Sequence, residues 1–78
     1  MLTPIEMQRT LPMALHGGVK STTTEVWAML SAAHSGNIAV AQELMAQRPE
    51  LATCQYNYTP PLHFAVREGH LALVRALV

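Results

Sequence analysis

The chain has 78 residues, of which 50% are hydrophobic and 13% are charged. The composition excludes an intrinsically disordered chain, which needs low hydrophobicity and high net charge, and the length excludes a two-domain enzyme. Five basic residues balance five acidic ones, so nothing in the charge favours binding to nucleic acid or to an anionic membrane.

The single cysteine, Cys54, cannot form an internal disulfide. A short chain without disulfides is typical of a reducing compartment. No apolar stretch approaches the 18 residues of a membrane span, and no basic segment followed by an apolar run opens the chain. We therefore expect a cytoplasmic protein.

Residues 1–20 predict an amino-terminal capping helix followed by a Gly-Gly linker. Thr3 precedes Pro4 and stands three residues before Glu6, a pattern typical of a helix start. Pro12 should kink this helix, and Gly17-Gly18 should end it. An apolar stripe would consist of Leu2, Ile5, Leu11 and Leu15. We expect the helix to pack over the open face of the helices that follow.

Residues 21–53 predict two helices joined by a glycine turn. Thr22 and Glu25 fit a capping box, with Thr23 or Thr24 as alternative caps. The apolar residues then recur at helical spacing: Val26, Met29, Leu30 and Ala33. Gly36-Asn37 should end this helix. The apolar face of the second helix would be Ile38, Ala41, Leu44 and Met45, and Pro49 should stop it.

Residues 54–78 repeat this organisation after a turn-rich stretch. Residues 50–60 carry no helical period, and the turn-rich residues 55–61 contain Pro60 and Pro61, which disfavour helix just before them. The apolar pattern then resumes with Leu62, Ala65 and Val66, breaks at Gly69, and resumes with Leu71, Val74, Leu77 and Val78. Gly69 follows Gly36 by 33 residues, and apolar positions align on both sides. This offset indicates an internal repeat.

Residues 59–74, Thr-Pro-Pro-Leu-His-Phe-Ala-Val-Arg-Glu-Gly-His-Leu-Ala-Leu-Val, resemble an ankyrin repeat. The family pattern runs Thr-Pro-Leu-His-x-Ala, then Gly-His and an apolar helix, and its period is 33 residues. The residues that match the structural motif are Gly36, Pro61, Leu62, His63, Ala65, Gly69 and His70. The resemblance covers residues 25–78. It implies an all-α helix-turn-helix solenoid with a divergent first repeat (21–53) and an incomplete second one (54–78), as in the amino-terminal fragment of a longer array.

Two residues depart from the family pattern. Thr59 stands one place earlier than the family's threonine, which puts its bond to the motif histidine and its capping of the helix in doubt. Tyr58 stands where a glycine is usual in the finger, the turn-rich loop of residues 55–61. We therefore expect this finger to have an irregular shape.

Catalytic, nucleotide and metal sites are poorly supported. Residues 17–22, Gly-Gly-Val-Lys-Ser-Thr, approach a phosphate-binding loop, but Val19 separates glycine from lysine and no strand is expected before them. His63 and His70 are too far apart in sequence for a helical metal site with Glu68. Cys54 would need a neighbouring base to act as a nucleophile. We expect no enzyme activity, cofactor or metal.

The aromatic residues favour a binding function. Tyrosine and tryptophan are frequent at binding hot spots, and Trp27, Tyr56, Tyr58 and Phe64 are the chain's four large aromatics. By resemblance, ankyrin proteins bind other proteins through finger tips and the concave face of the first helices. Carried over by position, the partner-binding surface would be Gln55, Tyr56, Asn57, Tyr58, Phe64, Arg67 and Glu68. Trp27 is expected to fill the core rather than bind.

Three alternatives to a simple interaction module stay open, and a small ligand-binding domain is the weakest of them because no polar cluster converges on a pocket. The chain could be the regulatory or targeting amino-terminal part of a longer multidomain protein or enzyme. It could also self-associate through an exposed apolar end, residues 71–78, which contains Leu71 and Val78.

Overall fold

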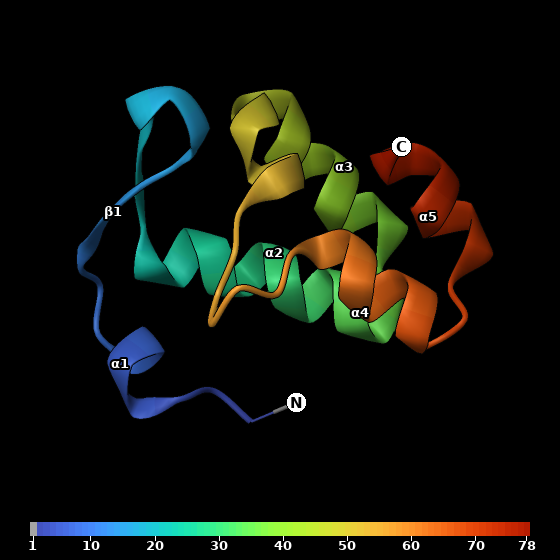
Figure 1. The fold of residues 1–78 in the computed structure, drawn as a ribbon, viewed down its shortest axis with the longest axis horizontal. Coiled ribbons are helices and arrows are strands. Elements are labelled where there is room, and N and C mark those ends of the chain that lie inside the picture. Colours follow the sequence, from blue (N-terminus) through green and yellow to red (C-terminus); the bar gives the residue numbers. More distant parts are fainter. Residues whose placement is uncertain (1) are drawn as a thin grey trace.

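A computed structural model describes residues 2–78. Its elements in chain order are α1 (Ile5–Gln8), β1 (Pro12–Ala14), the 3-10 turn η1 (His16–Gly18), β2 (Lys20–Thr22), α2 (Thr23–Ser35), α3 (Ile38–Gln47), the 3-10 turn η2 (Pro49–Thr53), α4 (Pro61–Arg67) and α5 (Leu71–Leu77). Helices α2 and α3 form one hairpin, α4 and α5 form a second, and α4 packs along α2 (Figure 1). The fold is mostly helical, and its two-stranded sheet corrects the all-α expectation.

Helix α2 supplies most of the core. Its N-cap is Thr22, whose hydroxyl accepts a hydrogen bond from the Glu25 N–H at 3.2 Å, so the predicted helix start is confirmed. The four residues predicted to form its apolar face, Val26, Met29, Leu30 and Ala33, are fully buried. Gly36 ends the helix with a φ of 75°, as predicted.

The second helix of the first hairpin also follows the prediction. The Asn37 side chain caps α3 by accepting from the Val40 N–H at 3.2 Å, and Ala41 is fully buried. The other three residues of the predicted face, Ile38, Leu44 and Met45, pack half-buried against the core. The turn η2, which the sequence did not predict, follows Arg48 and buries Leu51.

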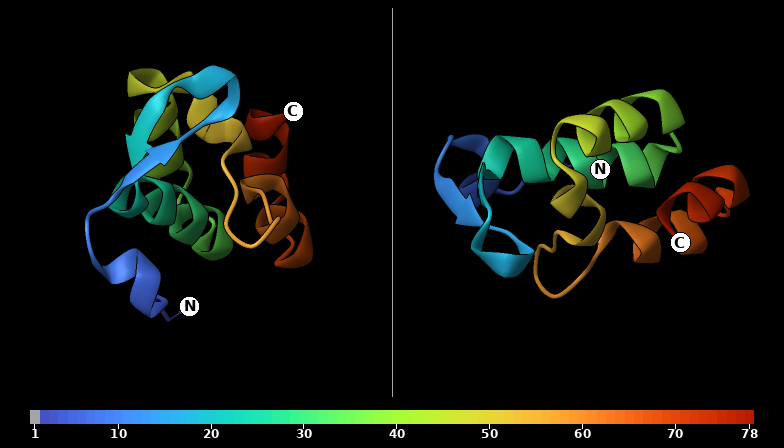
Figure 2. Two further views of the ribbon diagram at one scale, coloured as in Figure 1. Left: turned by 60° about the vertical axis from the view of Figure 1, so that its left-hand side comes forward. Right: turned by 90° about the horizontal axis from the view of Figure 1, so that it is seen from above.

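The helix predicted over the first sixteen residues is wrong beyond Gln8. Its N-cap is Pro4 rather than Thr3. Strands β1 and β2 pair antiparallel, with Pro12 opposite Thr22 (Figure 2). Proline is poorly tolerated inside a helix, and Gly17-Gly18 adopts φ values of 75° and 77°, which suit a hairpin turn. The same residues that were expected to kink and end a helix therefore build a hairpin.

The predicted amino-terminal stripe changes with it. Leu15 is buried, but Leu2 and Ile5 are 94% and 79% exposed, and Met7 is buried instead. A helix of about one turn cannot carry a stripe across residues 2–15. The expectation that no strand precedes residues 17–22 is also wrong, because β1 does so and residues 20–22 are β2.

Neither helix of the second hairpin has a side-chain hydrogen bond at its N-cap. The N-cap of α4 is Pro60, without a side-chain bond, and the Thr59 hydroxyl instead donates to the Asn57 carbonyl at 3.3 Å. The main core residue of α5 is Leu73, which is buried and lay outside the predicted stripe. Leu71 and Val78, at the two ends of that stripe, are exposed.

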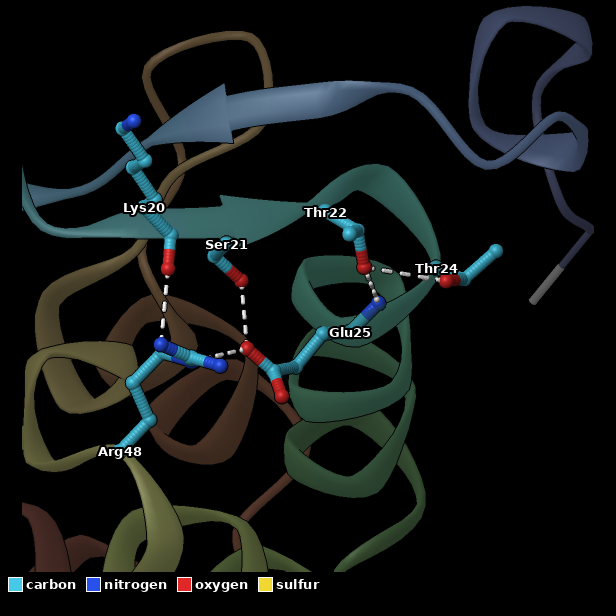
Figure 3. A network of polar contacts seen from close by, with 6 residues as sticks. All are labelled: Lys20, Ser21, Thr22, Thr24, Glu25 and Arg48. Carbon is cyan, nitrogen blue, oxygen red and sulfur yellow. Dashed lines mark hydrogen bonds and ion pairs between the residues drawn. The ribbon is translucent and has the colours of Figure 1, made fainter.

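One carboxylate joins the sheet to both helices of the first hairpin. Glu25 Oε1 accepts from the Ser21 hydroxyl and from Arg48 Nε, each at 2.5 Å (Figure 3). Arg48 Nη1 also donates to the Lys20 carbonyl at 2.8 Å. Glu25 therefore holds β2 and the end of α3 to the start of α2, rather than completing a reciprocal capping box.

Candidate interaction surface

The finger before α4 is closed by a tight turn. The Tyr56 N–H donates to the Thr59 carbonyl at 3.2 Å, and the Thr59 N–H donates to the Tyr56 carbonyl at 3.0 Å. Asn57 and Tyr58 both have positive φ, 55° and 63°. Positive φ at both central residues is typical of a type I′ hairpin turn, which favours Asn-Gly. The turn therefore has a regular geometry, and its one unusual feature is that Tyr58 occupies a position where glycine is favoured.

Tyr58 is held in a costly conformation and yet buries almost nothing. A left-handed backbone costs a residue other than glycine about 1–2 kcal/mol. The Tyr58 side chain is 91% exposed, so packing does not offset that cost. An exposed aromatic at a strained position is more typical of a binding site than of a stabilising contact.

Tyr56, by contrast, is engaged within the molecule. Its ring meets the Trp27 ring edge-on, with centroids 5.7 Å apart, and its hydroxyl donates to the Glu6 carboxylate. This bond lowers the pKa of Glu6 and raises the pKa of Tyr56. Glu6 and Tyr56 are 50 residues apart, and no sequence pattern linked them. Trp27 itself packs half-buried against the core.

Helix α4 carries the remaining residues of the predicted surface. Phe64 is half-buried, and the centroids of its ring and the His34 ring are 6.1 Å apart. Arg67 and Glu68 lie at the other end of the helix from the finger, with Arg67 Nε 3.6 Å from Glu68 Oε2. His34 Nε2 also lies 4.0 Å from Glu68 Oε1. The predicted residues are thus spread out: the first four precede α4, Phe64 lies in the middle of the helix, and Arg67 and Glu68 lie at its end.

The motif residues Gly36 and His70 form one contact between the hairpins. His70 Nε2 bonds the His34 carbonyl at 2.9 Å, and a Cβ added to Gly36 would lie 2.5 Å from the His70 ring. Gly36 is therefore needed for its positive φ and for its lack of a side chain. The motif residues Pro61 and Ala65 are buried. His63, expected to be structural, is exposed and lines a shallow apolar groove of about 400 Å³ with Leu62 and Val66.

Cys54 has the chemistry of a core residue. It is 3% exposed, and burial raises its pKa to about 12. The thiolate that a nucleophile requires is therefore scarce near neutral pH. Among residues 2–78, no group of three or more His, Cys, Asp or Glu side chains is placed to hold a metal ion. Within the same range, none of the helices has the length and apolar character to cross a membrane.

A family model described as ankyrin repeats (many copies) matches residues 29–78. The match begins inside α2 and runs through α5, so it covers both hairpins and leaves out α1 and the sheet. No curated protein sequence and no solved structure matches the chain.

Proposed function

Because the chain belongs to the ankyrin-repeat family, we propose that it is a protein–protein interaction module with no catalytic activity of its own. Ankyrin repeats generally mediate contacts between proteins and are typically not catalytic. In this proposal the two hairpins are units of a helical solenoid, and the module acts in the cytoplasm.

Tyr58 is the observation that carries the proposal. It presents a whole aromatic ring to solvent at the tip of the finger, in a backbone conformation that disfavours tyrosine. Aromatic side chains supply large contact areas at a small cost in conformational entropy, which suits them to anchor a partner. Because the turn fixes its backbone, Tyr58 is also partly ordered before binding.

The rest of the proposed surface lies on the finger and along α4. The side chains of Gln55 and Asn57 are exposed on the same turn. Arg67 and Glu68, exposed at the far end of α4, supply one charge of each sign. Phe64 is half-buried and contributes less of its ring than Tyr58 does. This mixture of one exposed aromatic and balanced charges suits a polar protein surface rather than nucleic acid or a membrane.

The test compares partner capture by the wild type with capture by Tyr58→Gly. Glycine suits the positive φ of this position, so the variant should fold at least as stably as the wild type while it lacks the ring. We expect it to lose partners that the wild type retains. Val40→Ala, which truncates an exposed apolar side chain on α3, is the matched control and should retain them. Identical partner sets for all three proteins would refute the role of Tyr58.

A second candidate function is self-association through the second hairpin. Leu71 and Val78 are 70% and 89% exposed, and the α4 groove beside His63 is largely apolar. If copies pair through the second hairpin, the melting temperature should rise with protein concentration. Substitution of Val66, which lines the groove, by Glu should abolish that dependence.

A further inference from the structure

Residues 2–8, here called the strap, are held to the rest of the molecule by very little. Met7 is the buried side chain of α1, while Leu2 and Ile5 face solvent. The Gln8 amide bonds the Thr3 carbonyl within the strap itself. The one side-chain hydrogen bond that links the strap to the helical hairpins runs from the Tyr56 hydroxyl to Glu6. A one-turn helix is not stable by itself, so these two contacts keep the strap in place.

The residues that follow the strap are fixed much more firmly. The Thr23 hydroxyl donates to the Arg9 carbonyl and accepts from the Leu11 N–H at 3.0 Å. The Thr23 N–H in turn donates to the Leu11 carbonyl at 2.9 Å. Thr23 is buried at the start of α2. The strap can therefore detach while the chain stays anchored at residues 9–11.

An open cleft separates part of the strap from α2. It measures about 520 Å³ and is lined on one side by Met7 and Gln8 and on the other by Trp27 and Ala28. Met7, 3% exposed, is the strap's residue in the hydrophobic core, whereas Leu2 and Ile5 already face solvent. Detachment of the strap would therefore take only Met7 out of the core.

We propose that the strap is a releasable cover over Trp27 and Tyr56, and that it restrains partner binding at the finger. In the covered state the Glu6 carboxylate accepts a hydrogen bond from the Tyr56 hydroxyl, and Met7 lies over the α2 face beside Trp27. Release frees the Tyr56 hydroxyl and the part of Trp27 that lies beside Met7, which adds to the aromatic surface that Tyr58 presents. This inference rests on the proposed function, because it regulates the same surface.

The first test needs no partner. Tyr56→Phe removes the hydroxyl and keeps the ring against Trp27, and Tyr58→Phe makes the same change on an exposed residue as the control. We expect Tyr56→Phe to increase acrylamide quenching of Trp27, the only tryptophan. We also expect exchange of the Met7 amide, which donates to the Pro4 carbonyl, to be faster than in the wild type, because the strap loses its side-chain bond to Tyr56. Glu6→Ala should increase quenching and exchange to the same extent as Tyr56→Phe. The double variant should show no larger effect than either single variant, because both substitutions remove the same hydrogen bond.

Two results would overturn the cover. Unchanged quenching and exchange in Tyr56→Phe would mean that the hydroxyl does not hold the strap. Equal acceleration of amide exchange across α2 to α5 would mean that the strap is an integral part of the fold.

The regulatory role is tested with a partner captured by the wild-type protein. Tyr56→Phe should bind it more tightly than the wild type, and Tyr58→Gly more weakly. Equal or weaker binding by Tyr56→Phe, with Tyr58→Gly still defective, would reject the cover and leave the proposed function intact. Normal binding by Tyr58→Gly would reject the proposed function, whatever the strap does.

Discussion

Replacing Gly36 by alanine should destabilise the protein in two separable ways. Gly36 has a φ of 75°, where alanine pays about 1–2 kcal/mol of backbone energy. Its new Cβ would also lie 2.5–2.8 Å from three atoms of the His70 ring. The ring must move, and this breaks the 2.9 Å bond from His70 Nε2 to the His34 carbonyl. A hydrogen bond contributes about 1 kcal/mol, so the total loss should be about 2–3 kcal/mol.

The chain contains its own control for this prediction. Gly69 has the same φ of 75°, but nothing lies within 4 Å of a Cβ built there. Gly69→Ala should therefore cost only the backbone energy, about 1–2 kcal/mol. The expected difference between the two variants, about 1 kcal/mol, measures the contact between the hairpins.

Urea denaturation followed by circular dichroism measures both losses. A small protein has an m-value near 1 kcal/mol/M in urea, so the two midpoints should differ by about 1 M. A chain of this size has an unfolding free energy of about 4–12 kcal/mol, and both variants should stay folded. In a His70→Ala background the two glycine substitutions should cost the same. Equal midpoints in the wild-type background would refute the packing argument.

Three further predictions concern other contacts. Arg48→Ala should lower the unfolding free energy by about 1 kcal/mol because it removes bonds to Glu25 and Lys20. Arg67→Ala, whose pair with Glu68 is exposed, should change it by less than about 0.5 kcal/mol. Equal urea midpoints for the two variants would contradict this. Cys54 should react with Ellman's reagent at pH 8 only after urea unfolding, because burial raises its pKa to about 12; fast reaction of the native protein would show an accessible thiol. The Glu6 carboxyl should titrate below its ordinary pKa of 4.5 by NMR and return toward it in Tyr56→Phe. Because the folded pKa is lowered, the bond's contribution is present above pH 4.5 and is lost as the pH falls through the folded pKa.

The sequence was most informative where structure depends on near neighbours. The apolar period of α2, its cap Thr22 and the glycine that ends it are all local signals, and the structure has each of them. The finger was also placed correctly, because prolines and a lack of helical period mark it.

The amino-terminal region was predicted less well because its signals are ambiguous. Pro12 and Gly17-Gly18 are compatible with a broken helix and with a β-hairpin, and only pairing with β2 decides between them. Four residues of α1 are too few for helical periodicity to be informative.

The sequence could predict which residues form the candidate surface, but not which of them are free to bind a partner and which are engaged within the molecule. Tyr56 and Tyr58 look equivalent in the sequence, yet one is bonded to Glu6 and the other is exposed. The bond from His70 to His34 spans 36 residues. Such contacts depend on how the hairpins pack, which local patterns do not encode.

The shared carboxylate of Glu25 also constrains the order in which this protein can accept mutations. If Ser21 or Arg48 is replaced, Glu25 keeps the other donor. If Glu25 is replaced first, the buried Ser21 hydroxyl and the Arg48 guanidinium both lose their shared acceptor. The effect of a substitution at any of the three positions therefore depends on what already occupies the other two. Evolutionary paths that change Ser21 or Arg48 before Glu25 stay open, while the reverse order crosses a less stable intermediate.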